Sequence, residues 1–244
     1  MSSDLEIIGE IIESSTTEFA AESRELYSPP PFGSFVKVDF AAEAAGEAAP
    51  PVEPEPKSDG DFDPFRESAG RFGSTYRGIV EGELDGTAQV VSPAIYAVVH
   101  QATTTSSDSG RRPRAYWKDE QQLKEEQPEL EWLLLTEFRA IVIGYAANGS
   151  IRQILPPKPP RLHSRVHLCA PEEIELVTSR MDFLRTIANF RNAPCDEAVA
   201  ACIREANNAR GGDLDFLVAA GKELAALLRD DYDRLQAIMR RIAL

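Results

Sequence analysis

Apolar and polar positions alternate over the first forty residues, and this alternation predicts three short β-strands at 5–13, 18–23 and 32–40. A period of two favours strands over helices, because successive side chains of a strand point to opposite faces. In the third strand the valines are predicted to point one way, and Lys37 and Asp39 the other. Three strands in such close succession indicate a small antiparallel barrel.

Glycines accompany these strand patterns at Gly9, Gly33 and Gly78. Glycine inside or beside a strand commonly marks a bulge or a sharp barrel corner where a side chain would clash. We therefore expect tight backbone contacts at these three positions.

The alternation stops at about 41–70, where alanine, glutamate and proline dominate. Such a segment has little to bury and carries like charges that repel, so it is predicted to be a mobile insertion in the barrel. An alternative interpretation is that this acidic segment attracts a basic partner. Strand patterns resume at 76–82 and 94–100 and are followed by a polar loop at about 103–118.

The next segment combines a short helix with a hairpin. A helix is predicted over 119–135, with Pro128 as a break or a new first turn. Strands at 138–145 and 151–155 are predicted to turn at Asn148-Gly149, a pair typical of the type I′ turn. A last strand is expected at 165–169.

From Pro171 the apolar period changes to that of helices. Pro171 suits a first helical turn, and apolar residues then recur every three or four positions through Ile187. A second helix at 196–210 is stopped by Gly211-Gly212, and Asp213 can cap the next one. Residues 214–243 form either one long helix or two. The predicted fold is therefore α+β, with a β-barrel domain at 1–170 and a helical domain at 171–244.

The formal net charge of −14 is concentrated in the first 68 residues, which hold 16 acidic and 4 basic side chains. A field of this sign repels polyphosphates and favours encounter with basic partners. No apolar run approaches the roughly 18 residues that a membrane span needs. The start of the chain lacks the features of a signal peptide, and three cysteines without a C-x-x-C pair indicate no disulfide framework. These features predict a cytoplasmic protein.

Several kinds of catalytic site find no support in the sequence. The nearest approach to a phosphate-binding loop is Gly221-Lys222-Glu223, which lacks both the first glycine and the final Ser or Thr. His163, His167 and Cys169 are the only cluster with metal-ligand side chains, and the alternative is a surface histidine followed by two strand positions. Because no fourth ligand is visible, we expect neither a metal nor a cofactor and predict that the chain is not an enzyme.

The best nucleic-acid candidate is a short basic and aromatic run in the polar loop. Guanidinium groups can pair with phosphates and aromatic rings can stack on bases. The alternative is a solvated loop whose aromatic side chains pack on the barrel. The residues are Arg111, Arg112, Arg114, Tyr116 and Trp117.

The N-terminal segment resembles the HAS-barrel, the small β-barrel named after HerA-type helicases and ATP synthases. Four runs carry the resemblance: Ile8-Gly9-Glu10-Ile11-Ile12, Ser15-Thr16-Thr17-Glu18-Phe19, Phe32-Gly33-Ser34-Phe35-Val36-Lys37-Val38 and Ile95-Tyr96-Ala97-Val98-Val99. The C-terminal runs Met181–Arg185, Ala201–Ala206 and Gly211–Leu217 are similar to the helical tail of stand-alone bacterial HAS-barrel proteins.

The resemblance implies an adaptor or assembly role beside a HerA-like hexameric ATPase that translocates DNA. No ATPase domain follows the barrel here, which is a departure from the fused helicases. The helical tail offers an apolar stripe to its own barrel or to a partner, and its candidate docking residues are Leu235, Ile238 and Ile242. Self-association is a further expectation. The alternatives are a nucleic-acid-binding accessory module that uses the Arg111–Trp117 loop, and a metal-dependent hydrolase.

Overall fold

A computed structural model describes residues 6–39, 92–108, 110, 113–191 and 193–243. The predicted insertion at 41–70, the predicted strand at 76–82 and Gly78 lie outside these ranges.

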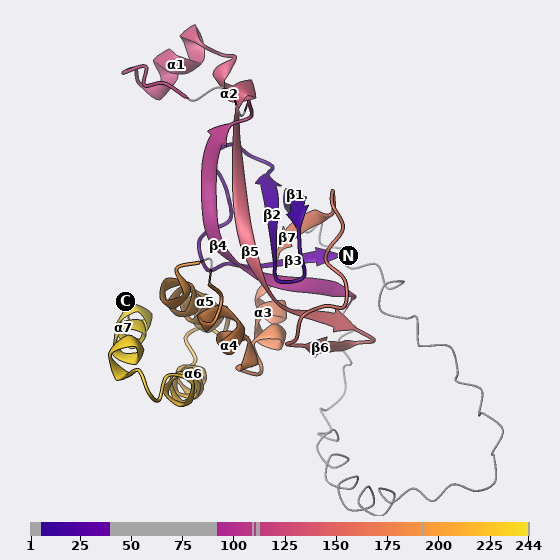
Figure 1. The fold of residues 1–244 in the computed structure, drawn as a ribbon, viewed down its shortest axis with the longest axis vertical. Coiled ribbons are helices and arrows are strands. Elements are labelled where there is room, and N and C mark those ends of the chain that lie inside the picture. Colours follow the sequence, from indigo (N-terminus) through magenta and orange to yellow (C-terminus); the bar gives the residue numbers. More distant parts are fainter. Residues whose placement is uncertain (1–5, 40–91, 109, 111–112, 192, 244) are drawn as a thin grey trace, which may run out of the picture. The chain divides into compact units, whose positions relative to one another are not determined.

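Six strands of the described part close into an antiparallel barrel (Figure 1). Around the barrel the order is β1, β7, β3, β4, β5 and β2, and the pairing of β2 with β5 closes the ring. A seventh strand, β6, pairs only with β5. The strands are β1 (Ile7–Ser14), β2 (Glu18–Ser23), β3 (Phe35–Asp39), β4 (Ala94–Ser106), β5 (Leu134–Ala147), β6 (Ser150–Arg152) and β7 (Arg165–Leu168).

The interior of the barrel is filled by apolar side chains from all six of its strands. Period-two alternation places one side chain of each successive pair inside, so the inner set includes Ile11, Phe19, Val38, Phe138 and Val166. These five side chains are almost completely buried. The closed barrel is therefore packed with its own residues.

The helices α3 to α7 follow β7 and cover part of the outer wall of the barrel. One hydrophobic cluster contains outward-facing residues of β3, β4 and β5 together with residues of these helices. The ring of Phe35 meets that of Phe183 edge-on, with centroids 6.2 Å apart. The predicted α+β class is confirmed in this form. The helices are α1 (Glu120–Glu126), α2 (Leu130–Leu133), α3 (Pro171–Val177), α4 (Asp182–Ala188), α5 (Cys195–Ala209), α6 (Leu214–Leu227) and α7 (Tyr232–Ile242).

The alternation predicted for β3 is confirmed, because its valines belong to the barrel interior and Lys37 points outward to α3. Lys37 is buried, and its ammonium group pairs with Glu173 of α3. Glu173 also accepts a hydrogen bond from the backbone N–H of Ala170 at 2.9 Å. The pair therefore ties the first turn of α3 to the barrel wall. Asp39, predicted on the same face as Lys37, is exposed.

The β5–β6 hairpin confirms the predicted type I′ turn. Asn148 and Gly149 both have positive φ, at 53° and 75°, as this turn requires at its two central residues. The strands run from Leu134 to Ala147 and from Ser150 to Arg152, so β5 begins earlier and β6 ends earlier than predicted.

Of two predictions around the β4–β5 connection, one is wrong and the other is confirmed except at its C-terminal bound. Thr103 to Ser106 were assigned to a polar loop, but they extend β4 by pairing with the start of β5. The helical segment at 119–135 is interrupted at Pro128 as predicted, which gives α1 and α2, but Leu134 already belongs to β5. Pro128 lies between the two helices, because a proline lacks the N–H that a continuous helix needs.

The helical segment also divides more often than its apolar period indicates. A break between α3 and α4 interrupts the apolar repeat from Pro171 to Ile187. The side chain of Gln153 forms hydrogen bonds with the backbone groups at this break. The Gln153 amide donates to the carbonyls of Val177 and Arg180 and accepts from the N–H of Phe183. Residues 214–243 form two helices, α6 and α7.

Helix α5 ends where the glycine pair was predicted to stop it. Gly211 and Gly212 have φ of 69° and 89°, and Asp213 then caps α6 by accepting from the N–H of Asp215. Within the described ranges, every helix falls short of the length and apolar character that a bilayer crossing requires.

Candidate functional site on the outer wall of the barrel

A chain of polar side chains crosses four strands on the outer wall of the barrel. Glu13 lies next to the end of β1, Glu18 begins β2, His100 lies in β4 and Arg139 in β5. Their neighbours Phe19, Val99 and Phe138 belong to the interior core, so the polar residues point outward. The strand register brings them together, because Ala20 of β2 pairs with both Glu13 and Arg139.

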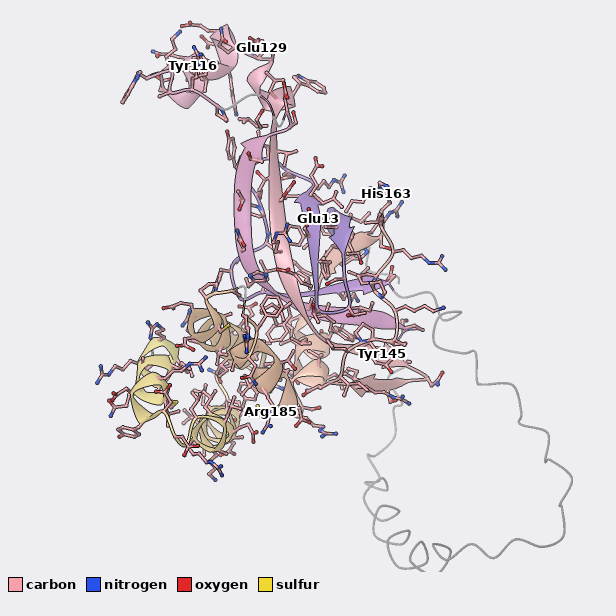
Figure 2. The ribbon with its side chains drawn as sticks, in the orientation of Figure 1. Glu13, Tyr116, Glu129, Tyr145, His163 and Arg185 are labelled. Atoms are coloured by element: carbon pink, nitrogen blue, oxygen red, sulfur yellow. The ribbon has the colours of Figure 1, made fainter. Side chains whose placement is uncertain are left out.

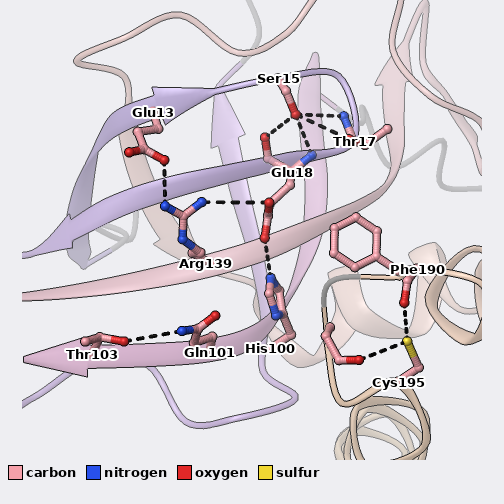
Figure 3. A network of polar contacts seen from close by, with 11 residues as sticks. Glu13, Ser15, Thr17, Glu18, His100, Gln101, Thr103, Arg139, Phe190 and Cys195 are labelled. Carbon is pink, nitrogen blue, oxygen red and sulfur yellow. Dashed lines mark hydrogen bonds and ion pairs between the residues drawn. The ribbon is translucent and has the colours of Figure 1, made fainter.

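The four side chains form a continuous series of contacts (Figure 3). The Nε2 atom of His100 lies 2.6 Å from Oε1 of Glu18. Arg139 contacts Glu18 at 3.8 Å and donates a hydrogen bond of 2.6 Å to Glu13. The series leads from the buried His100 to the largely exposed Glu13. The hydrogen bond to Glu13 raises the pKa of Arg139 above its usual value.

The β1–β2 turn fixes the position of Glu18. The hydroxyl of Ser15 accepts from the N–H groups of Thr17 and Glu18 and donates to the carbonyl of Glu18 at 2.8 Å. This local pattern is characteristic of serine in turns. It orients the carboxylate of Glu18 toward His100.

His100 has one nitrogen paired and one without a partner. Its Nδ1 atom is buried and makes no hydrogen bond within the described part of the chain. The ring lies against Phe190, with centroids 5.6 Å apart. His100 therefore connects the barrel wall to the segment between α4 and α5.

Phe190 also contacts Cys195, whose thiol donates a hydrogen bond to the backbone carbonyl of Phe190. Burial raises the pKa of this thiol, so it stays protonated at neutral pH. Burial also raises the pKa of Cys169 and Cys202. A protonated thiol is a weak nucleophile.

The candidate metal ligands of the hydrolase alternative lie in three different surroundings. His163 is exposed and its Nδ1 atom lies 2.6 Å from Glu10, while His167 is buried near Asp39. Cys169 belongs to the core shared with the helices. The described residues contain no group of three or more His, Cys, Asp or Glu side chains that could hold a metal ion.

The predicted nucleic-acid residues are only partly described. Arg111 and Arg112 lie outside the described ranges, and Arg114 is exposed. Tyr116 and Trp117 are exposed as well, Trp117 at 95%. The alternative in which this tryptophan packs on the barrel is therefore wrong.

The predicted docking residues of the tail belong to the helical core. Ile238 is completely buried, and Leu235 and Ile242 pack partly buried against the same cluster. The stripe faces the other helices, with α7 packed against α5. Partner contact at Leu235 and Ile242 stays a prediction, whereas Ile238 has no exposed surface to offer.

Sequence reasoning missed the Glu13–Glu18–His100–Arg139 cluster and the Lys37–Glu173 pair. Both depend on contacts between residues more than eighty positions apart, and such contacts leave no local motif. The histidine in an otherwise apolar run, residues 94–100, was the available signal.

Comparison with known proteins adds no family to this description. No protein-family model matches the chain, and no curated protein matches it.

Proposed function

We propose that the chain is a cytoplasmic, non-enzymatic adaptor that binds other proteins through the outer surfaces of its barrel and helices. The observation that carries this proposal is the packing of the barrel, whose interior is occupied by its own apolar side chains. Because the interior is occupied, the outer surface is the part of the barrel that can recognise another molecule. The protonated thiols and the scattered histidines are consistent with a binding role.

The partner we propose is a subunit of a HerA-like hexameric ATPase. This choice rests on the resemblance of the N-terminal strands to the HAS-barrel and on the negative net charge of −14, which favours a basic partner surface. The closed antiparallel barrel is compatible with the proposal.

The test is reconstitution with a purified HerA-like ATPase from the same organism. We expect the two proteins to co-elute in size-exclusion chromatography at micromolar concentration, and the complex to weaken as salt is raised. The control is the same ATPase with an unrelated protein of similar charge. Separate elution at low salt would refute the ATPase as partner.

A second candidate is a nucleic-acid-binding accessory module. The exposure of Trp117 beside the exposed Arg114 favours it, because a free indole ring can stack on an unpaired base. A mobility-shift assay with single-stranded and double-stranded DNA and RNA across salt decides the matter. Binding that declines steeply with salt supports the module, and no shift at low salt removes it.

A further inference from the structure

Both tryptophans of the chain lie in the β4–β5 connection with their side chains in solvent. Trp117 is 95% exposed and Trp132 is 86% exposed. Tryptophan is usually among the best-buried side chains of a folded protein, and it is enriched at the centres of protein interfaces. Two exposed tryptophans in one connection therefore mark a surface that is completed by another molecule.

The far ends of β4 and β5 extend beyond the barrel as a two-stranded ribbon that carries this connection (Figure 1). We call the described residues within 101–136 the arm. Among the described residues, residues 101–106 of β4 pair with β5 alone, and residues 134–136 of β5 pair with β4 alone. The arm is anchored at its base. The hydroxyls of Thr104 and Thr136 lie 2.8 Å apart, and the N–H of Tyr27 donates to Thr136 at 3.0 Å.

The far end of the arm is acidic. Residues 116–133, the arm tip, hold six acidic and two basic side chains, a net charge of −4. One of the two lysines, Lys118, is paired with Glu126. Glu125 and Glu129 are exposed, and Figure 2 shows Glu129 and Tyr116 on this part of the chain. Asp119 caps α1 by accepting from the N–H of Gln122 at 2.8 Å.

We propose that the arm tip docks on a partner protein whose surface surrounds an apolar pocket with lysine and arginine side chains. The indole rings supply the apolar anchors, and the carboxylates supply the complementary charge and speed the encounter. The proposal rests on the proposed adaptor function and names its docking surface. The negative charge disfavours nucleic acid at the tip, although Arg111, Arg112 and Arg114 precede it in the sequence, so nucleic acid is an outcome that the test separates.

The experiment uses the full chain with benzoylphenylalanine in place of Gln121, an exposed residue of α1, so that both tryptophans are kept. Cross-linking in cells and mass spectrometry identify the partner, which is then purified. Its affinity is measured for the wild type and for Trp132→Ala, Trp117→Ala and the double variant Glu125→Lys/Glu129→Lys. The matched control is Ile154→Ala, which removes an exposed apolar side chain outside the arm.

We expect Trp132→Ala to weaken binding at least tenfold at an unchanged urea midpoint, and Ile154→Ala to leave it within twofold. The charge-reversal variant should slow association, and the wild-type complex should weaken with salt. Equal affinity of the wild type and the tryptophan variants would overturn the proposal. So would cross-links that form only to nucleic acid, only between copies of this chain, or not at all.

Failure of this proposal is distinguishable from failure of the proposed function. A HerA-like ATPase that binds the wild type and Trp132→Ala equally leaves the adaptor function standing and removes the arm tip as its docking surface. An ATPase that does not bind, together with a different basic protein whose binding needs Trp132, removes the ATPase and supports the arm tip.

Discussion

Gly33 lies two residues before β3 and packs against Ala201 of α5. Its φ is +88°, and a Cβ atom built there would lie 2.4 Å from the Cβ of Ala201. Two separate constraints therefore require glycine: the backbone conformation and the space. Gly9 satisfies the same expectation, because a Cβ atom there would lie 2.5 Å from the carbonyl oxygen of Glu22.

We predict that Gly33→Ala lowers the free energy of unfolding by about 2–4 kcal/mol, from strain at positive φ and from overpacking against α5. Gly149→Ala is the matched control, because Gly149 has φ of +75° with no atom within 4 Å of the added Cβ, and it should lose only about 1 kcal/mol. Urea unfolding followed by circular dichroism measures both. Equal losses in the free energy of unfolding would mean that α5 moves away from the added methyl group without a measurable cost.

Glu18 and Glu13 make a second matched pair, because both contact Arg139 but differ in burial. The side chain of Glu18 is 17% exposed and that of Glu13 is 63% exposed. Glu18→Ala leaves both nitrogens of the buried His100 without a partner and should destabilise the protein by about 2 kcal/mol. Glu13→Ala breaks a surface pair and should change stability by less than about 1 kcal/mol. A larger loss for Glu13→Ala than for Glu18→Ala in urea unfolding would contradict this account of the cluster.

Residue-level prediction from the sequence succeeded where the requirement is local. The type I′ turn at Asn148-Gly149, the stop at Gly211-Gly212 and the cap at Asp213 each depend on a residue's own backbone preference. The environment of Lys37 could not be predicted this way. Its burial depends on α3 covering the outer wall of β3, more than 130 residues later in the chain.

At the scale of elements, the packing of α7 against α5 changes what the apolar stripe of the tail means. The sequence identified the stripe but could not say what covers it, since an amphipathic helix has the same pattern whether it faces its own core or a partner. The structure buries Ile238 within the helical core. Arg204 of α5 also donates to the carbonyl of Arg241, which ties the two helices together.

We predict that Ile238→Asp destabilises the helical core by about 3 kcal/mol or more, because it buries a carboxylate with no partner. Tyr232→Asp introduces the same side chain at the exposed first turn of α7, where negative charge is favourable, and should change stability by less than about 0.5 kcal/mol. Thermal unfolding compares the two variants. If Ile238→Asp were as stable as the wild type, contacts other than that of Ile238 would hold α7 on the helical core.

The short helices show the limit of periodicity. The apolar repeat from Ile174 to Ile187 continues across a break that is stabilised by Gln153, a residue of another segment. Similarly, the polar composition of Thr103 to Ser106 favours a loop, yet these residues extend β4 because β5 is available to pair with them. Tertiary partners override local composition at such places.

At the scale of the whole molecule, the two buried thiols, Cys169 and Cys202, give the stability a defined pH dependence. Burial raises the pKa of Cys169 and Cys202 in the folded state, whereas unfolded thiols titrate at about 8.5. Above that pH the unfolded chain has released protons that the native protein retains. Stability is therefore complete below about pH 8.5 and declines as the pH rises further.

We predict that the free energy of unfolding falls between pH 8 and pH 10 in the presence of a reductant, by up to about 2 kcal/mol per buried thiol. The alanine variant Cys169→Ala should show a shallower decline than the wild type, because one titrating group has been removed. Urea unfolding at several pH values measures the two slopes. Identical slopes would mean that Cys169 ionises as readily in the native protein as in the unfolded chain.

The position of β7 in the ring has a consequence for biosynthesis. β7 separates β1 from β3 and pairs with both, yet it is the last strand of the barrel to be translated. A nascent chain therefore emerges from the ribosome with two open strand edges that persist until Arg165–Leu168 leaves the exit tunnel. A chain that terminates before those four residues lacks β7, so its barrel stays open between β1 and β3. Such fragments are candidates for chaperone capture or degradation.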